Sequence, residues 1–206
     1  SGLLGIYLVI CSYAAIGLFM SCLTSYQVVA AVATLGALAF LNYVGRIGQE
    51  VPFIRDITYW LSISGRSDEL INGLISSEDV FYFLIVIGLF LMLSIMVILS
   101  GKRKLSKSMA FTRYTGVIVL AMLLGYVTSR PGLQCSYDAS SIKLNSLNPV
   151  SQEIMEKMEG GLTITTYVNL LEGNFYRGAP SERNSDANRF KKFIRFKPKI
   201  QMNYVY

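Results

Sequence analysis

Two long stretches of this sequence carry no charged side chain. The first runs from Ser1 to Gly45 and the second from Val80 to Gly101. A helix of about 20 mostly apolar residues crosses the hydrocarbon core of a bilayer, so these stretches have room for two spans and one span. Residues 109–128 form a fourth apolar run that contains a single charge, Arg113, near one end. The chain is therefore predicted to be a multi-pass membrane protein.

The overall composition supports this prediction, because 52% of the residues are hydrophobic and only 16% are charged. A soluble domain of this length would rarely be so apolar. A polar elbow at residues 21–27 interrupts the first uncharged stretch and predicts two antiparallel helices, at 3–20 and 28–44. Small residues are frequent in the second of these helices, which favours close packing against another helix. The chain lacks an initial Met and ends in a strand-like segment, so we expect a fragment of a longer protein.

A polar segment separates the second predicted span from the third. Residues 46–79 form this connection, with three basic and six acidic residues, and residues 80–99 form the third predicted span. Within the connection, VPFIRDITYWLSI (51–63) has roughly helical spacing of apolar residues and contains Tyr59 and Trp60, residue types common at the membrane–water boundary. Both an interfacial amphipathic helix and an ordinary packed loop helix fit this pattern.

Beyond residue 128 the sequence has the composition of a soluble domain. We expect a helix that Asn148 caps and that begins at Pro149, followed by a buried strand at 162–171. A second helix is predicted at 181–196 and a second strand at 200–206. Strand, helix and strand in this order predict a parallel βαβ unit. The predicted fold class is thus a helical membrane part of about four transmembrane helices, followed by a partial α/β domain.

A short basic segment separates the third and fourth spans. It contains no acidic residue and five basic ones: Lys102, Arg103, Lys104, Lys107 and Arg113. Lys and Arg near the ends of spans mark the cytoplasmic side, so this linker at 101–113 is predicted to be cytoplasmic. By alternation the elbow is cytoplasmic too, whereas the connection 46–79 and residues 129–206 lie outside the cytoplasm.

Several classes of function are disfavoured by what the sequence lacks. It contains no histidine and no Cys-x-x-Cys pair, which removes Ser-His-Asp mechanisms and histidine-containing zinc sites. The only Gly-Lys pair lacks the earlier glycine of a nucleotide-binding loop, since Met96 stands there. A short basic linker between two spans also lacks the extended footprint of a nucleic-acid site. We expect no catalytic, cofactor or metal site on this chain. We do expect the chain to contact membrane lipids.

Two segments resemble the permeases of ABC type-2 exporters. AAIGLFMSCLTSYQVVAAV (14–32), which includes Thr24 and Gln27, resembles the elbow between their fourth and fifth spans. LINGLISSEDVFYFL (70–84) is similar to the segment that leads into their last span, with matches that include Gly73, Asp79 and Tyr82. From residue 144 on, LNSLNPVSQEIMEKMEGGLTITTYVNLL resembles the start of the exterior domain of the gliding-motility-associated ABC transporter component.

This resemblance implies a domain organisation. Residues 1–100 correspond to the last three spans of the permease bundle, 101–113 to a cytoplasmic linker, 109–128 to a fourth span, and 129–206 to the start of the extracytoplasmic α/β domain. In that family the permease and the exterior domain are separate polypeptides, whereas here they are joined.

The resemblance also implies a function: a non-enzymatic permease subunit of an ABC exporter in the bacterial cytoplasmic membrane. Its partners would be an ABC ATPase subunit, which binds ATP, and a second copy of the permease or a related permease. Thr24 and Gln27 of the elbow and the basic linker would be the coupling surfaces present here. The alternative is a membrane-anchored extracytoplasmic binding or scaffold protein, and a membrane enzyme that uses the exterior domain is a further rival.

Overall fold

The computed structural model describes residues 2–102, 107–130, 135–140, 143, 145–158, 161–168, 171, 179, 182–196 and 200–205. By their internal contacts the residues form two compact units. Unit 1 combines residues 1–41 with 66–139, and unit 2 combines 42–65 with 140–206. The connection between the second and third spans is therefore shared between the two units.

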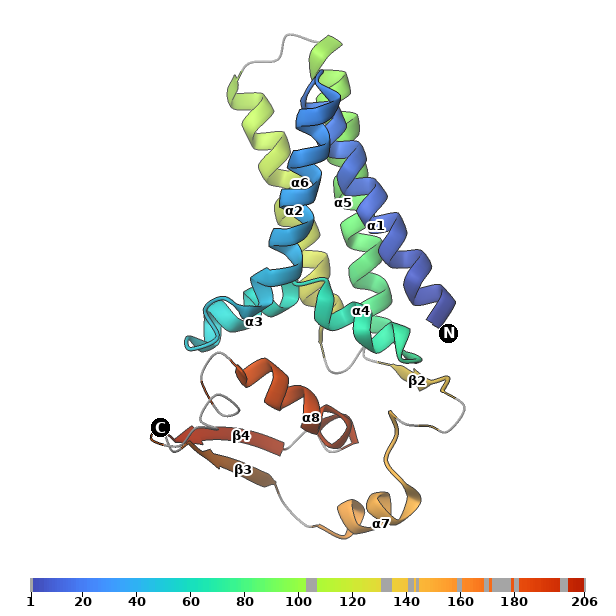
Figure 1. The fold of residues 1–206 in the computed structure, drawn as a ribbon, viewed down its shortest axis with the longest axis vertical. Coiled ribbons are helices and arrows are strands. Elements are labelled where there is room, and N and C mark those ends of the chain that lie inside the picture. The colour runs from blue at the N-terminus through green and yellow to red at the C-terminus, as the bar shows by residue number, and fades with distance from the viewer. Residues whose placement is uncertain are drawn as a thin grey trace. The chain divides into compact units, whose positions relative to one another are not determined.

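Unit 1 is mostly helical (Figure 1). Its elements are α1 (Gly2–Leu23), most of α2 (Gln27–Tyr43), most of α4 (Ser64–Ile71), β1 (Leu74–Ser76), α5 (Ser77–Lys102), α6 (Lys107–Thr128) and β2 (Ser136–Asp138). Strands β1 and β2 pair antiparallel, with Ile75 opposite Tyr137. Neither α4 nor this small sheet was predicted from the sequence.

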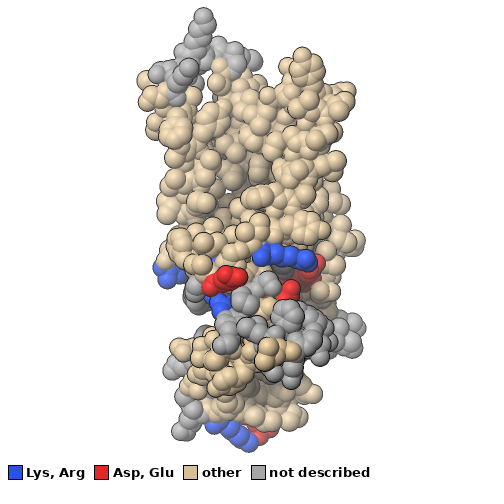
Figure 2. All heavy atoms as spheres, turned by 60° about the vertical axis from the view of Figure 1, so that its left-hand side comes forward, with Lys and Arg blue, Asp and Glu red and all other residues tan. Residues whose placement is uncertain are grey.

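Four helices in the described part of the chain are long and apolar enough to cross a membrane. The candidate spans are Gly2–Leu23, Gln27–Arg46, Ser77–Ser100 and Ser108–Thr128. All four predicted spans are thus confirmed as helices. On the face drawn in Figure 2, the long helices present an almost uncharged surface. The third predicted span, 80–99, lies within α5, which begins three residues earlier, at Ser77.

Helix α1 packs along α5. A Cβ atom on Gly5 would lie only 2.8 Å from the Cβ of Leu70, in the segment that precedes α5, so glycine permits this approach. Further along, the rings of Phe19 and Phe90 lie 5.6 Å apart. An early residue of α1 thus lies near the start of α5 and a late residue near its middle, so the two helices run parallel. The α1–α2 elbow, the end of α5 and the start of α6 therefore lie at the same end of unit 1 (Figure 1).

The small residues of α2 are mostly exposed in this chain. All of α2 is described, and Ala30 is its one buried residue. A Cβ atom on Gly36 would meet no other atom within 4 Å. The hydroxyl of Thr34 donates back to the carbonyl of Ala30 in its own helix, at 2.7 Å, and does not bond to another helix. Within the described chain most of α2 is therefore exposed, and close packing of its small residues against a helix of another chain stays a prediction.

Unit 2 contains the α/β part of the chain. Its elements are η1, a single 3-10 turn (Val44–Arg46), α3 (Pro52–Leu61), α7 (Pro149–Lys157), β3 (Leu162–Tyr167), α8 (Arg183–Phe196) and β4 (Ile200–Val205). Asn148 caps α7 as predicted, since its side-chain oxygen accepts a hydrogen bond from the amide of Val150 at 3.3 Å. The predicted cap of α8, Ser181, lies outside the described residues.

Strands β3 and β4 pair in parallel, as the βαβ pattern predicted, with Leu162 opposite Ile200 and Tyr167 opposite Val205. A small core of Leu147, Met155 and Ile200 lies beneath them, with Met158, Leu162, Ile164, Phe193 and Ile194 packed around it. The strand predicted at 162–171 is confirmed from Leu162, but it ends at Tyr167, and its residues are half-buried or exposed where a buried strand was predicted.

Helix α8 also contacts the segment that links α2 to α4. The amide of Asn184 donates to the side chain of Gln49 at 3.0 Å, and its side-chain nitrogen donates to the carbonyl of Gly45 at 2.9 Å. The hydroxyl of Tyr59 on α3 donates to Asn188 at 3.3 Å and accepts from Lys191 at 3.3 Å. Residues 42–65 and helix α8 are therefore parts of one packed unit.

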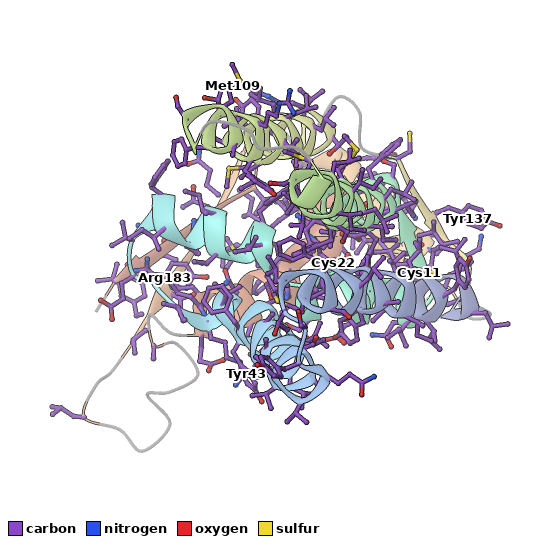
Figure 3. All side chains as sticks on the ribbon, turned by 90° about the horizontal axis from the view of Figure 1, so that it is seen from above. Cys11, Cys22, Tyr43, Met109, Tyr137 and Arg183 are labelled. Carbon is purple, nitrogen blue, oxygen red and sulfur yellow. The ribbon has the colours of Figure 1, made fainter. Side chains whose placement is uncertain are left out.

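The three cysteines, all within the described residues, are free thiols. Cys11 and Cys22 both lie on α1, at different levels along it (Figure 3). Cys135 precedes β2 and is exposed.

Candidate functional site

The start of α5 is held by a tight turn and a short sheet. Gly73 has a φ of +90°, a conformation that side chains with a Cβ atom rarely adopt, and its carbonyl accepts a hydrogen bond from Ala139 at 2.9 Å. Ser77, the first residue of α5, exchanges two bonds with Cys135: its amide donates to the Cys135 carbonyl, and its hydroxyl accepts from the Cys135 amide. The first turn of α5 is thus fixed in place.

A buried arginine of α4 faces this first turn. Arg66 donates to the carboxylate of Asp79 at 3.0 Å and to that of Glu78 at 2.9 Å. The side chains of Arg66 and Asp79 are each 4% exposed, whereas Glu78 is 22% exposed. Acidic groups in the first turn of a helix also interact favourably with its dipole. Glu78 and Asp79 are therefore stabilised within the first turn of α5.

Two further residues complete this cluster. The Arg66 guanidinium lies 4.8 Å from the centre of the buried Tyr82 ring, a cation–π arrangement. The hydroxyl of Ser129, just after α6, donates to Glu78 at 3.2 Å. We call Arg66, Glu78, Asp79, Tyr82 and Ser129 the arginine cluster. It joins α4, the start of α5 and the end of α6.

Chemically, the arginine cluster is suited to holding helices together. A guanidinium stays charged at any physiological pH and cannot act as a general acid or base. Removing one partner of such a buried pair is costly, because the other charge remains buried. Among the described residues, no group of three or more His, Cys, Asp or Glu side chains could hold a metal ion.

Two of the three positions of the last-span motif belong to the arginine cluster, and the third forms the turn before α5. Gly73 forms the turn, Asp79 pairs with Arg66, and Tyr82 lies under the guanidinium. Sequence reasoning missed Arg66, Glu78 and Ser129 as members of the site. The sequence contained only an indirect indication of them. Two adjacent acidic residues directly before an apolar run require a positively charged partner, but their spacing does not identify which basic residue that is.

The elbow residues lie far from this cluster. Helix α1 ends at Leu23, and the Thr24 hydroxyl accepts a hydrogen bond from the amide of Tyr26 at 3.2 Å, which shapes the turn. Gln27 is the first residue of α2 and is exposed. The arginine cluster lies at the other end of α5, a helix of 26 residues and hence about 39 Å long.

The basic linker lies at the elbow end of unit 1. Lys102 is the last residue of α5 and Lys107 the first of α6, and Arg113 is exposed on α6. Arg103 and Lys104 lie outside the described residues, as do the side chains of Lys102 and Lys107. The predicted coupling residues of the elbow and the linker are thus at one end, and the last-span motif is at the other.

Searches among protein-family models, curated proteins and solved structures found no match for this chain.

Proposed function

We propose that this chain belongs to the transmembrane permease subunit of an ABC exporter. The permease moves a substrate across the bacterial cytoplasmic membrane, and a separate ATPase subunit binds and hydrolyses ATP. The four apolar helices cross the membrane, the elbow and the basic linker face the cytoplasm, and residues 129–206 lie outside it. The parallel course of α1 and α5 is compatible with this topology, because it brings the elbow and the linker to one end.

The observation that carries the proposal is the arginine cluster. The motif positions Gly73, Asp79 and Tyr82 were selected by their resemblance to the last-span segment of ABC type-2 permeases. In the structure each position is physically constrained in a different way. Gly73 has a positive φ, Asp79 carries a buried charge, and the buried ring of Tyr82 lies against the Arg66 guanidinium. Residues under such demands tolerate few substitutions, which is a physical reason for a recognisable motif at these positions.

The geometry also supports a mechanism. ATP binding on the partner acts on the cytoplasmic end, at Thr24, Gln27 and the basic linker, and shifts the helices between two access states. The arginine cluster keeps α4, α5 and α6 together at the opposite end, so that they respond as one body. The exposed surface of α2, in which only Ala30 is buried, is where a second permease packs.

Affinity purification of the full-length protein from its native membranes tests the proposal. In mild detergent, an ATPase with a Walker-type nucleotide site should copurify in near-stoichiometric amounts, as identified by mass spectrometry. An unrelated multi-pass protein with the same tag is the control. Variants Thr24→Ala and Gln27→Ala should lower the ATPase activity of the purified complex without lowering the yield of the permease.

The rival with a specific observation in its favour is an extracytoplasmic binding or scaffold protein anchored by its spans. The α/β part has a core of its own around Leu147, Met155 and Ile200, as such a protein requires. Absence of a copurifying ATPase, together with ligand binding by the intact protein, would refute the permease proposal and favour this rival.

A further inference from the structure

Helix α3 is held against the last turn of a candidate span. The span Gln27–Arg46 ends at η1. The hydroxyl of Thr58 on α3 lies 3.1 Å from the carbonyl of Ile47, the next residue, and 2.9 Å from that of Ile54 in its own helix. A Cβ atom on Gly45 would lie 2.8 Å from the Cβ of Ser62, just after α3. Because α3 touches the residues at which the span ends, it lies at the level where that span leaves the membrane.

One side of α3 is covered by protein. Tyr59 donates to Asn188 of α8 and accepts from Lys191, whose ammonium also lies 5.8 Å from the Tyr59 ring. The hydroxyl of Thr58, the neighbouring residue, lies near the carbonyl of Ile47, directly after the span. These contacts occupy the more polar side of the helix.

Another side of α3 exposes large apolar residues. Phe53 is 74% exposed, Ile54 43% and Ile57 44%, and their spacing places them on neighbouring positions of one helical face. Ile47 and Val51, which precede the helix, are also exposed. Water-soluble surfaces rarely expose so many contiguous large apolar side chains.

The surroundings of this face favour a lipid surface over a protein partner. The exposed apolar residues begin at Ile47, the first residue after the candidate span, so they continue from a segment that itself faces lipid. Tyr59 and Trp60 are the residue types that concentrate at the boundary between membrane and water. Arg55 and Asp56 are adjacent in the sequence and cancel in formal charge, so burial of apolar area drives the contact.

We propose that α3 lies in the membrane–water interface, with Phe53, Ile54 and Ile57 among the lipid acyl chains and α8 covering its other side. A helix of this kind inserts its apolar face about 5–10 Å into the boundary between headgroups and acyl chains. The inference rests on the membrane-spanning part of the proposed function and is independent of transport.

Tryptophan fluorescence tests this placement, because Trp60 is the one tryptophan of the chain. In a Trp60→Phe background, Phe53→Trp moves the probe onto the exposed face, and Ile57→Trp provides a second position on that face. The full chain is reconstituted into vesicles of phosphatidylcholine and phosphatidylglycerol. The lipids are brominated either near the headgroup end or near the terminal end of the acyl chains.

We expect both probes to lose most of their emission with lipids brominated near the headgroups and much less with lipids brominated near the chain ends. Aqueous iodide should quench them weakly. Ile154→Trp is the matched control, because Ile154 is similarly exposed, at 58%, but lies on α7. Its emission should respond to iodide and not to brominated lipid.

A further probe separates the two ways in which the experiment can fail. Leu35 is exposed in the middle of α2, so Leu35→Trp should be quenched by lipids brominated near the chain ends if α2 spans the membrane. If Leu35→Trp behaves so while the α3 probes respond only to iodide, or to no quencher at all, water or a protein partner covers the face and the inference is overturned. If Leu35→Trp itself responds only to iodide, the spanning proposal fails and the inference fails with it.

Discussion

Replacing Arg66 by methionine tests whether the arginine cluster holds α5 on α4. The side chains of Arg66 and Asp79 are each 4% exposed and are joined at 3.0 Å. Without the guanidinium, Asp79 is left as a buried carboxylate with its main charge partner gone. Breaking a buried ion pair in this way costs about 3–5 kcal/mol of unfolding free energy. Glu78 is 22% exposed and can reach water, so the loss of its pair with Arg66 adds less to the cost in unfolding free energy.

A second substitution separates the ion pair from the loss of packing. In the double variant Arg66→Met, Asp79→Leu no buried charge is stranded, and apolar replacement of a buried pair is often close to neutral. The double variant should therefore be more stable than the sum of the two single variants predicts, with a coupling energy of about 1–3 kcal/mol. Tyr82 remains in place and packs on the methionine.

The assay is equilibrium unfolding in mixed detergent micelles, in which sodium dodecyl sulfate is titrated and helix content is followed by circular dichroism. Lys157→Met is the matched control: its pair with Glu153 is shorter, at 2.6 Å, but the two side chains are 74% and 65% exposed. An exposed pair contributes at most about 1 kcal/mol. The reasoning is refuted if Arg66→Met costs no more than Lys157→Met, or if the cycle shows no coupling.

Three further substitutions, one of them with its own control, can be measured by the same titration. Gly73→Ala should destabilise by about 1–2 kcal/mol, because its φ of +90° strains a residue with a Cβ atom; Gly36→Ala, where a Cβ atom meets nothing within 4 Å, should be neutral or stabilising, and equal effects of the two would contradict the described turn. Gly5→Ala should cost about 1–3 kcal/mol through its close approach to Leu70, and a neutral result would mean that α1 does not pack so closely. Asn148→Ala should cost about 0.5–2 kcal/mol through loss of the α7 cap; an unchanged midpoint would show that the cap contributes nothing.

Local chemistry was enough to predict most of the helices and strands. Long uncharged runs become helices in an apolar environment because their backbone groups must bond within the segment, and this is why the four long helices were found. Asn148 followed by Pro149 is a start signal that acts within a few residues, and it placed α7 correctly. The alternation of residues 200–206 placed β4, because side chains of a strand point to opposite faces in turn.

The sequence by itself therefore determined the apolar helices, the α/β character of the end of the chain, and the motif positions Gly73, Asp79 and Tyr82. Only the tertiary structure decided that Arg66 pairs with both Glu78 and Asp79, which follow it by twelve and thirteen residues and lie in the first turn of α5. It also decided that α3 packs on the end of a candidate span and on α8. The physical reason is that charge pairing and packing depend on distance in space. The local periodicity of apolar residues does not determine which segments, far apart in the sequence, come into contact.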